Sequence, residues 1–252
     1  MDKGPQERGI IDMQSSNYHI TWLGHATFKL QTPRGKMVLI DPWVQGNPAC
    51  PPEQKKIDHL DAMLITHGHF DHIGDAVTIA KEAKPSTVVG VFELCNWLES
   101  KGVENCSGMN IGGSQVIDGL RVTMTHADHS CGILDGGTIL YGGVAAGYVL
   151  ELENGTTLYH TGDTGLFGDL SLIGELYHPS VVMLPIGDHF TMGPREAAYA
   201  CKLLKPQAVI PMHYGTFPLL TGTPTAFQTA LAEAGLQYIE VITMHPGQTI
   251  QR

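Results

Sequence analysis

The amino-acid sequence predicts an α/β protein built as a four-layer αββα sandwich, in which two β-sheets pack face to face with helices outside. Each half of the chain starts with meandering strands and continues with alternating strands and helices, a pattern typical of layered sheets. The 252 residues can bury one sizeable core. No stretch is rich enough in Gly, Ser or Pro to form a linker, so we expect one domain over residues 18–252 after a polar N-terminal extension, residues 1–17.

The first half is expected to form a hairpin meander followed by strand–helix units. Pro33-Arg34-Gly35-Lys36 supplies the turn residues of a hairpin, and Asp118-Gly119 is a second strong turn signal. Apolar and β-branched runs indicate strands, and apolar residues at helical spacing indicate helices. The predicted strands are 18–23, 27–31, 37–40, 62–66, 88–90, 114–117 and 120–125, and the predicted helices are 74–84 and 92–101.

The second half repeats this rhythm. Asn154-Gly155 separates two predicted strands, Pro194 stands at the first position of a predicted helix, and Gly235 follows the end of another. The predicted strands are 146–151, 156–160, 181–184, 208–210 and 239–242, and the predicted helices are 166–176, 194–204 and 224–234.

Four metal-capable side chains follow the buried strand over 62–66, in the run His67-Gly68-His69-Phe70-Asp71-His72. Alternate residues of an extended segment point the same way, so His67 and His69 can reach one metal. Asp71 and His72, beyond the bend, can face a second. Imidazole suits zinc, iron, nickel or manganese, and a carboxylate favours a catalytic site over a closed structural one. The alternative interpretation is a surface loop that is merely rich in His.

The pattern His67-x-His69-x-Asp71-His72 resembles the signature of the metallo-β-lactamase superfamily. Three later positions, each behind an apolar strand, match the remaining motifs of that superfamily. The resemblance implies two divalent metal ions, with Zn²⁺ favoured and Mn²⁺ or Fe as alternatives. The implied ligands of one metal are His67, His69 and His129, those of the other are Asp71, His72 and His213, and Asp163 is shared.

Each later position also has an interpretation without metal. In Thr125-His126-Ala127-Asp128-His129-Ser130 two His compete. Similarity to the Pro-Ala-x-His-x-Ser run of lactonase-like and phospholipase-like branches favours His129 and leaves His126 as a residue that contacts a ligand or lines the pocket. Asp163 could instead cap the helix that follows it, and His213 could be a hydrogen-bonded core His.

Two further segments resemble one branch of the superfamily, a group of metal-dependent hydrolases related to L-ascorbate-6-phosphate lactonase-like proteins. Trp22–Phe28 and Ile40-Asp41-Pro42 resemble its opening hairpin. Asp41 is then expected to orient a His ligand through the free ring nitrogen. His25 is either a pocket residue or a turn His on the surface.

A second such segment is Pro185–Gly193, where the branch usually has Asn in place of His189. This difference leaves His189 either in the substrate pocket or at the cap of the helix that starts at Pro194. Phe190 and Tyr214 are expected near the pocket.

The activity implied by the resemblance is hydrolysis of a small ester, lactone or phosphate-containing metabolite by a hydroxide that two metals share. Asp71 would carry a proton to the leaving group, and His25, His126 or His189 would donate hydrogen bonds to the oxyanion. The alternatives are a di-iron oxidoreductase, a phosphodiesterase or ribonuclease of the same superfamily, and a metal-binding protein without catalysis.

Composition narrows the partners. The formal charge of −10 and a single basic doublet, Lys55-Lys56, argue against nucleic acid, whose phosphates require clustered Lys and Arg. Five Cys without a CxxC motif favour a reduced compartment. With no apolar run near the roughly 20 residues of a membrane span and no signal-like start, we expect a cytoplasmic enzyme that acts on a small molecule. Related proteins are often homo-oligomers.

Overall fold

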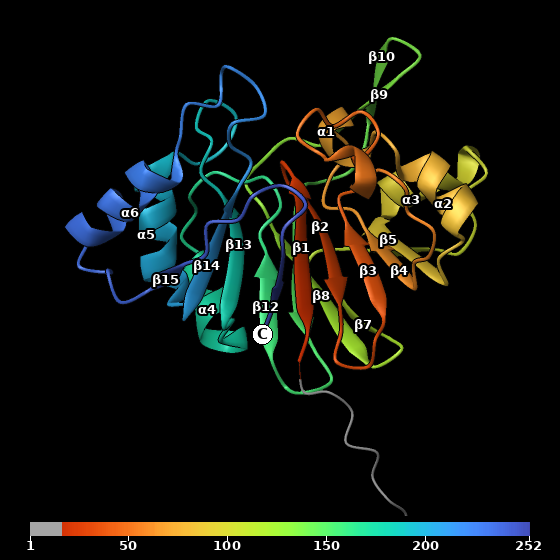
Figure 1. Ribbon diagram of the computed structural model, residues 1–252. Coiled ribbons are helices and arrows are strands. Elements are labelled where there is room, and N and C mark those ends of the chain that lie inside the picture. The colour runs from red at the N-terminus through yellow and green to blue at the C-terminus, as the bar shows by residue number, and fades with distance from the viewer. Residues whose placement is uncertain (1–16) are drawn as a thin grey trace, which may run out of the picture.

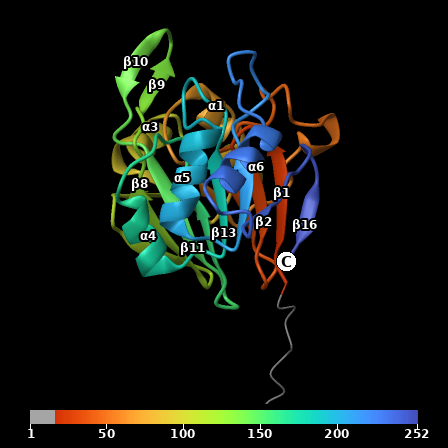
Figure 2. The same cartoon turned by 90° about the vertical axis from the view of Figure 1, so that its left-hand side faces the viewer.

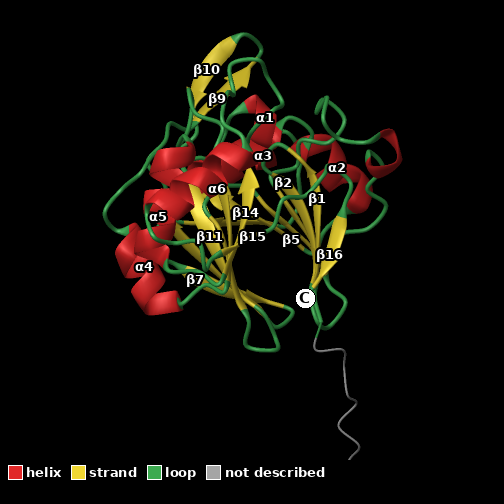
Figure 3. Ribbon diagram, turned by 60° about the vertical axis from the view of Figure 1, so that its left-hand side comes forward, coloured by secondary structure: helices red, strands yellow, loops and turns green. Residues whose placement is uncertain are grey.

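The computed structural model describes residues 17–252. All but the last residue of the expected N-terminal extension, 1–17, therefore lies outside the described residues. Two seven-stranded sheets face each other, and helices cover their outer sides (Figures 1 and 3). The expected αββα sandwich is confirmed. No helix among residues 17–252 is long and apolar enough to cross a membrane.

The first sheet is built mainly from the first half of the chain and has the order β16-β1-β2-β3-β4-β5-β6. Strands β16, β1, β2 and β3 pair antiparallel, and β3 to β6 pair parallel. Its strands are β1 (His19–Gly24), β2 (Thr27–Gln31), β3 (Met37–Ile40), β4 (Ala62–Leu64), β5 (Thr87–Val91), β6 (Cys106–Met109) and β16 (Thr249–Gln251).

The second sheet has the same plan, with the order β15-β14-β13-β12-β11-β8-β7. Strands β7, β8, β11 and β12 pair antiparallel, and β12 to β15 pair parallel. Its strands are β7 (Ser114–Ile117), β8 (Leu120–His126), β11 (Ala146–Glu151), β12 (Thr157–His160), β13 (Val181–Pro185), β14 (Ala208–Met212) and β15 (Glu240–Val241).

Helices α4 to α6 cover the outer face of the second sheet, whereas α2 and α3 lie beside the first (Figures 1 and 3). A separate hairpin of β9 (Gly132–Asp135) and β10 (Thr138–Tyr141) projects from the body (Figure 2). The helices are α1 (Phe70–Ile73), α2 (Ala76–Ala83), α3 (Phe92–Ser100), α4 (Leu170–Tyr177), α5 (Pro194–Leu204) and α6 (Pro224–Glu233), and a short 3₁₀ turn covers Pro52–Gln54.

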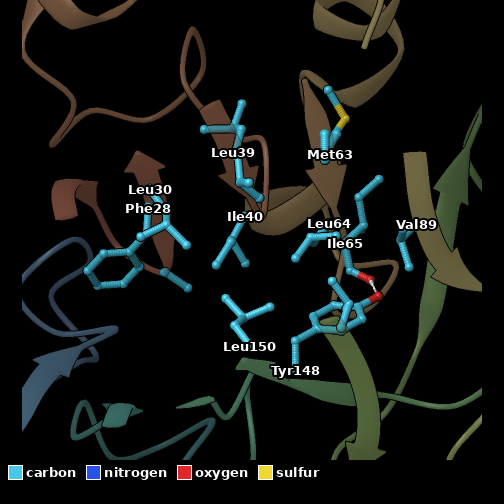
Figure 4. Close-up of a cluster of buried hydrophobic side chains, with 14 of the residues drawn as sticks. Phe28, Leu30, Leu39, Ile40, Met63, Leu64, Ile65, Val89, Tyr148 and Leu150 are labelled. Atoms are coloured by element: carbon cyan, nitrogen blue, oxygen red, sulfur yellow. Dashed lines mark hydrogen bonds between the residues drawn. The ribbon is translucent and has the colours of Figure 1, made fainter. Parts of the chain in front are cut away.

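Strand β11 shows how the chain fills two apolar layers at once. Tyr148 and Leu150 point into the layer between the sheets, where Figure 4 shows them near Phe28, Ile40 and Leu64. The side chain between them, Val149, belongs instead to the layer under α4 to α6. Successive side chains of a strand alternate between faces, so a continuous apolar run is what a strand buried on both faces requires. The Tyr148 hydroxyl donates to the carbonyl of Ile65, 2.7 Å away, which satisfies a buried polar group just before the loop that carries His67 and His69.

The structure contains several elements that the sequence analysis did not predict. These are α1, β6, β9, β10 and β16. Strand β16 pairs with β1 across more than 200 residues, and no local pattern reports such a distant partner. The helix expected over 166–176 begins only at Leu170, because the preceding residues form the loop that leaves Asp163.

Three helices end on a non-glycine residue in the left-handed region. They are α2, α4 and α5, with φ of +47° at Lys84, +45° at His178 and +54° at Lys205. At Lys205 the backbone N–H donates to the carbonyl of Cys201 at 2.8 Å, so the cap hydrogen bond is made despite the strain on the Lys side chain. Glycine adopts this conformation without that strain.

We predict that Lys205→Gly raises the free energy of unfolding by about 1 kcal/mol and the thermal midpoint by about 2–4 °C. Lys202→Gly is the matched control, because Lys202 is also exposed but lies inside α5. It should lower the free energy of unfolding by about 1 kcal/mol. Chemical denaturation of the three proteins checks this, and a loss of stability in Lys205→Gly would contradict it.

Candidate metal centre

The potential metal donors stand on loops that leave four strands of two different sheets. His67, His69, Asp71 and His72 follow β4, and Asp71 and His72 lie in the short helix α1 at one edge of the sandwich (Figure 1). The second sheet contributes His129 after β8, Asp163 after β12 and His213 after β14. The carboxyl ends of neighbouring parallel strands share one edge of a sheet, which is where α/β proteins build their sites.

Backbone hydrogen bonds hold these loops together. The N–H of Gly165 donates to the carbonyl of Asp128 at 2.9 Å, and the N–H of Asp128 donates to Thr164 Oγ1 at 3.0 Å. These two bonds tie the His129 loop to the Asp163 loop. On the other side, the N–H of His213 donates to the carbonyl of His25 at 3.1 Å, which joins the third loop to the β1–β2 turn of the opposite sheet.

The first donor group consists of His67, His69 and His129. One donor atom from each residue lies within 4.8 Å of the others. His69 Nδ1 is 3.0 Å from His67 Nε2 and 3.3 Å from His129 Nε2. Three imidazole nitrogens that converge on one point in this way leave room for a cation with a further open position.

The second donor group centres on Asp163. Its Oδ2 lies 2.9 Å from His213 Nε2, 3.2 Å from His72 Nε2 and 3.7 Å from His129 Nε2. Asp71 also converges with His72 and His213 within 4.8 Å. One carboxylate oxygen is therefore within reach of donors from both groups. That is the arrangement the sequence analysis expected of a bridging Asp163.

The donor set fits metal ions better than it fits internal hydrogen bonds. His72 Nε2, both ring nitrogens of His213 and Asp163 Oδ1 are buried without a hydrogen-bond partner, although charged neighbours are close. An unsatisfied buried polar group costs about 1–3 kcal/mol, so a cluster of them at one point in a native protein requires an explanation. Cations that accept these lone pairs provide one.

His72 is oriented by a buried carboxylate on its other side. Its Nδ1 lies 2.7 Å from Asp41 Oδ2, and Asp41 also accepts hydrogen bonds from the N–H and the hydroxyl of Thr66, each at 2.8 Å. Asp41 has a φ of +51°, a conformation that Asp tolerates better than most residues. Its contact with Nδ1 turns Nε2 toward Asp163, as the expected orienting role requires.

His25 is fully buried, so it is not a turn His on the surface. Its Nε2 lies 3.1 Å from Asp71 Oδ2, and its Nδ1 lies 3.0 Å from Thr216 Oγ1. Its ring packs 3.9 Å, between centroids, from that of His213. His25 also converges with Asp71, His72 and His213 as a potential donor, a role that the sequence analysis did not consider.

A cavity of about 700 Å³ opens above the donors. Phe190 lines it as expected, and so does Ser130, whose hydroxyl lies 3.2 Å from His69 Nε2. The expectation for His126 needs correction: β8 ends at His126, whose exposed ring packs against Phe167, and the loop turns toward His69 only at His129. Of the two competing His, the structure thus brings His129 into the donor cluster.

The expectations for His189 and Tyr214 also need correction, since neither lines the cavity. His189 is exposed with a φ of +59°, and its ring packs against Phe190. It does not cap α5 either, whose N-cap is Gly193. Tyr214 turns back from His213 and stacks on Trp22, with ring centroids 5.4 Å apart. Adjacent residues of a bent loop point to different sides, which the linear motif does not reveal.

Cys131 is one of the five cysteines, to which the sequence analysis assigned no role in the site, yet it supports the loop that carries His67 and His69. Its sulfur accepts from the N–H of Gly68 at 3.3 Å and donates to the carbonyl of Gly142 at 3.1 Å. A Cβ at position 68 would lie 2.6 Å from Ile133 Cγ1, which explains glycine between the two His. The position of Cys131 two residues after His129 was the one available sequence signal.

Burial and mutual charge set the protonation of the metal-free cluster. Burial lowers the pKa values of His67, His69 and His129, and the neighbouring His72 lowers those of His67 and His69 further. Burial alone would raise the pKa of Asp163, but His213 and His72 outweigh it and hold that pKa well below its usual range. Burial would likewise lower the pKa of His72, but Asp163 and Asp41 raise it well above 6.5. Cations that bind His72 therefore replace a proton.

His25 should lower the stability of the metal-free protein as the pH falls. Burial, together with the charge of His213, lowers the pKa of His25 from 6.5 to about 4. Between about pH 6.5 and 4 the unfolded chain binds a proton at His25 and the folded chain does not. The free energy of unfolding therefore decreases as the pH decreases through this range. The expected contribution of His25 at pH 5.5 is about 1 kcal/mol.

His72, with its raised pKa, works in the opposite direction, so His25 is isolated by comparing wild type with His25→Gln. Thermal midpoints of chelator-treated protein at about pH 7.5 and 5.5 provide the measurement. His25→Gln should show the smaller drop. Equal drops in the two proteins would show that the pKa of His25 is the same in the folded and the unfolded state.

Comparison with known proteins places this geometry in a family. An αββα sandwich with His and Asp donors at one edge of both sheets defines a metal-dependent class of protein. The family described as Beta-lactamase superfamily domain matches residues 36–214, a range that contains all seven expected ligands. The chain therefore belongs to the metallo-β-lactamase superfamily.

The individual relatives agree. A UPF0173 metal-dependent hydrolase of Koribacter versatilis is 55% identical over 240 residues, which cover 94% of this chain and 99% of the relative. A solved metallo hydrolase from the hyperthermophilic archaeon Ignicoccus hospitalis is 37% identical, with a TM-score of 0.82 over 94% of this chain and 98% of the other. An isothiocyanate hydrolase from Delia radicum gut bacteria, 22% identical with a TM-score of 0.70, covers 92% of this chain and 98% of its own and shares the fold. The expectation of a metal-dependent hydrolase of this superfamily is confirmed.

Proposed function

We propose that this hydrolase holds two divalent cations, with Zn²⁺ as the leading candidate, and cleaves a small ester, lactone or phosphate-containing metabolite. The observation that carries the proposal is the position of Asp163 Oδ2, within 3.7 Å of nitrogens from three His that belong to two donor groups. A shared carboxylate lets two cations lie about 3.5–4 Å apart.

Seven side chains would hold the pair. The proposed ligands are His67, His69 and His129 for one cation and Asp71, His72 and His213 for the other, with Asp163 between them. His25 converges with the second group and could complete it. When bound, such a pair supplies Lewis acidity toward the substrate oxygen and a nucleophile derived from water near neutral pH.

Proton transfer in this proposal depends on the carboxylate of Asp71, which other side chains of the protein orient. Asp71 lines the cavity, and His25 Nε2 holds its Oδ2 at 3.1 Å. Burial alone would raise the pKa of Asp71, but the His25 hydrogen bond and the charge of His72 lower it below its usual range, so Asp71 is a carboxylate at neutral pH. It can accept a proton at the cavity floor and deliver it to a leaving group, while Thr216 holds the far side of His25.

We predict that Asp163→Asn abolishes hydrolysis and reduces the bound metal from two ions to one or none per chain, because the shared negative charge is lost while the side-chain shape is kept. Metal quantification by mass spectrometry and a screen of esters, lactones and phosphodiesters provide the measurements. A fully active variant with two metals would sink the proposal. Two iron ions with a visible absorption band and no hydrolysis would favour the di-iron oxidoreductase instead.

His129→Asn and His126→Asn form a matched pair for the same assay. The two His lie three residues apart, but only His129 reaches the donor cluster. We expect His129→Asn to lose metal and at least about 10-fold in rate, the range seen when a metal site is disturbed, and His126→Asn to keep both. The reverse pattern would assign the ligand to His126.

A further inference from the structure

We propose that the cavity above the metal donors binds the apolar group of an uncharged ester or lactone, which narrows the substrate class and rests on the proposed hydrolase function. The rim and wall of the cavity form an apolar cup, which we define as Phe70, Phe190, Phe217, Pro218 and Leu219. The polar donors that line the same cavity, among them Asp71, Asp163 and His213, are less exposed and form its inner part. The cavity thus has one polar and one apolar end, as an ester with an alkyl or aryl substituent requires.

Three separate segments build the cup. Phe70 opens helix α1, Phe190 lies in the loop after β13, and Phe217 to Leu219 lie in the loop after β14. Each of these segments also carries or follows a proposed ligand or a strand end at the same edge of the sandwich. The apolar side chains are therefore positioned by the same elements that position the metal donors.

One side of the cup is supported from behind. The buried Trp43 packs against Phe70 and against Phe217, with ring centroids 5.9 Å apart in both pairs, and the two Phe rings are 6.4 Å from each other. Phe217 also packs against His25, at 5.6 Å between centroids. Aromatic contacts at these distances are attractive, so this wall is preformed.

The exposed apolar side chains of the cup indicate that an apolar part of a ligand covers them. Phe70 is 57% exposed, Phe190 52% and Leu219 53%, and all three surround one cavity. Single exposed apolar side chains are ordinary, but a group of them around a concave site indicates a binding site for an apolar ligand group.

Charge argues against an anionic substituent at this end. Among residues 17–252, no Lys or Arg lines the cavity, and the acidic residues that line it are Asp71 and Asp163. A phosphate that is not itself the reacting group would lie among Phe, Pro and Leu side chains without the cationic hydrogen-bond donors that phosphate sites use. Of the proposed substrate classes, carbonyl compounds with an apolar substituent fit this cavity, and metabolites that carry a phosphate away from the reacting group do not.

The first test is a chain-length series. For zinc-loaded wild type acting on p-nitrophenyl esters from acetate to octanoate, kcat/KM should rise by up to about fourfold per added methylene until the cup is full. The glutarate monoester of p-nitrophenol, whose acyl chain ends in an anionic carboxylate, should be hydrolysed far more slowly than the pentanoate ester. A rate that is flat or falls with chain length, or a preference for the anionic chain, would overturn the cup.

Variants locate the effect. Phe190→Ala and Leu219→Ser should each reduce the gain per methylene to about twofold or less, because part of the apolar contact is lost. Leu176→Ala is the control: Leu176 is 70% exposed on α4 and does not line the cavity, so this variant should keep the wild-type gain. Equal gains in all four proteins would place the apolar contact elsewhere.

A binding measurement separates this inference from the proposed function. Calorimetry with n-alkyl hydroxamic acids of increasing length needs no turnover. Suppose that affinity rises with chain length in wild type and rises less in Phe190→Ala, but that the protein hydrolyses no ester or lactone. The apolar binding site would then stand, and the proposed hydrolysis would be rejected. Ester hydrolysis together with length-independent binding and rates would keep the hydrolase and reject the cup.

Discussion

One buried carboxylate relates the two halves of this protein. Asp163 leaves the second sheet, yet its Oδ2 approaches His72 from the first sheet as closely as hydrogen-bonding distance, and it also approaches His213 and His129 from its own. Buried, unpaired lone pairs beside a protonated His72 require a compensating charge at such spacing. The negative charge of Asp163, together with the cations proposed to bind there, would offset the cost of bringing these donors so close to one another.

The layered fold supplies the geometry for this. In each sheet the antiparallel meander occupies one side and parallel strands the other, so β4, β12 and β14 deliver their following loops to one edge. The apolar layer between the sheets, with Phe28, Leu64 and Tyr148 at its centre (Figure 4), fixes the separation of those edges. A closely packed interior shifts little, and a site that needs donors from two sheets depends on that rigidity.

Local patterns predicted most of this architecture but not its long-range contacts. The strands β2, β3, β7 and β11 and the helix α5 lie at the expected residues. Their sequence signals, alternation and helix capping, depend only on residues that are close together in the chain. The pairing of β16 with β1, the contact of His25 with Asp71 and the turn of Tyr214 away from the cavity depend on residues far apart in the chain. The ordered motifs pointed to His67, Asp163 and His213, whereas the apolar cup is formed by residues of three unrelated loops, which have no common sequence signal.

The backbone conformation of three residues in or beside the donor cluster has a practical consequence. His25, Asp41 and His213 have φ values of +57°, +51° and +55°, and Asn is among the few side chains that tolerate this region. An alanine scan there changes two quantities at once, the donor atom and the backbone preference. Substitution by Asn keeps the backbone preference nearly constant, so it reports on the change of the donor atom. Substitution by Val or Thr would report mainly on the energetic cost of the left-handed backbone conformation.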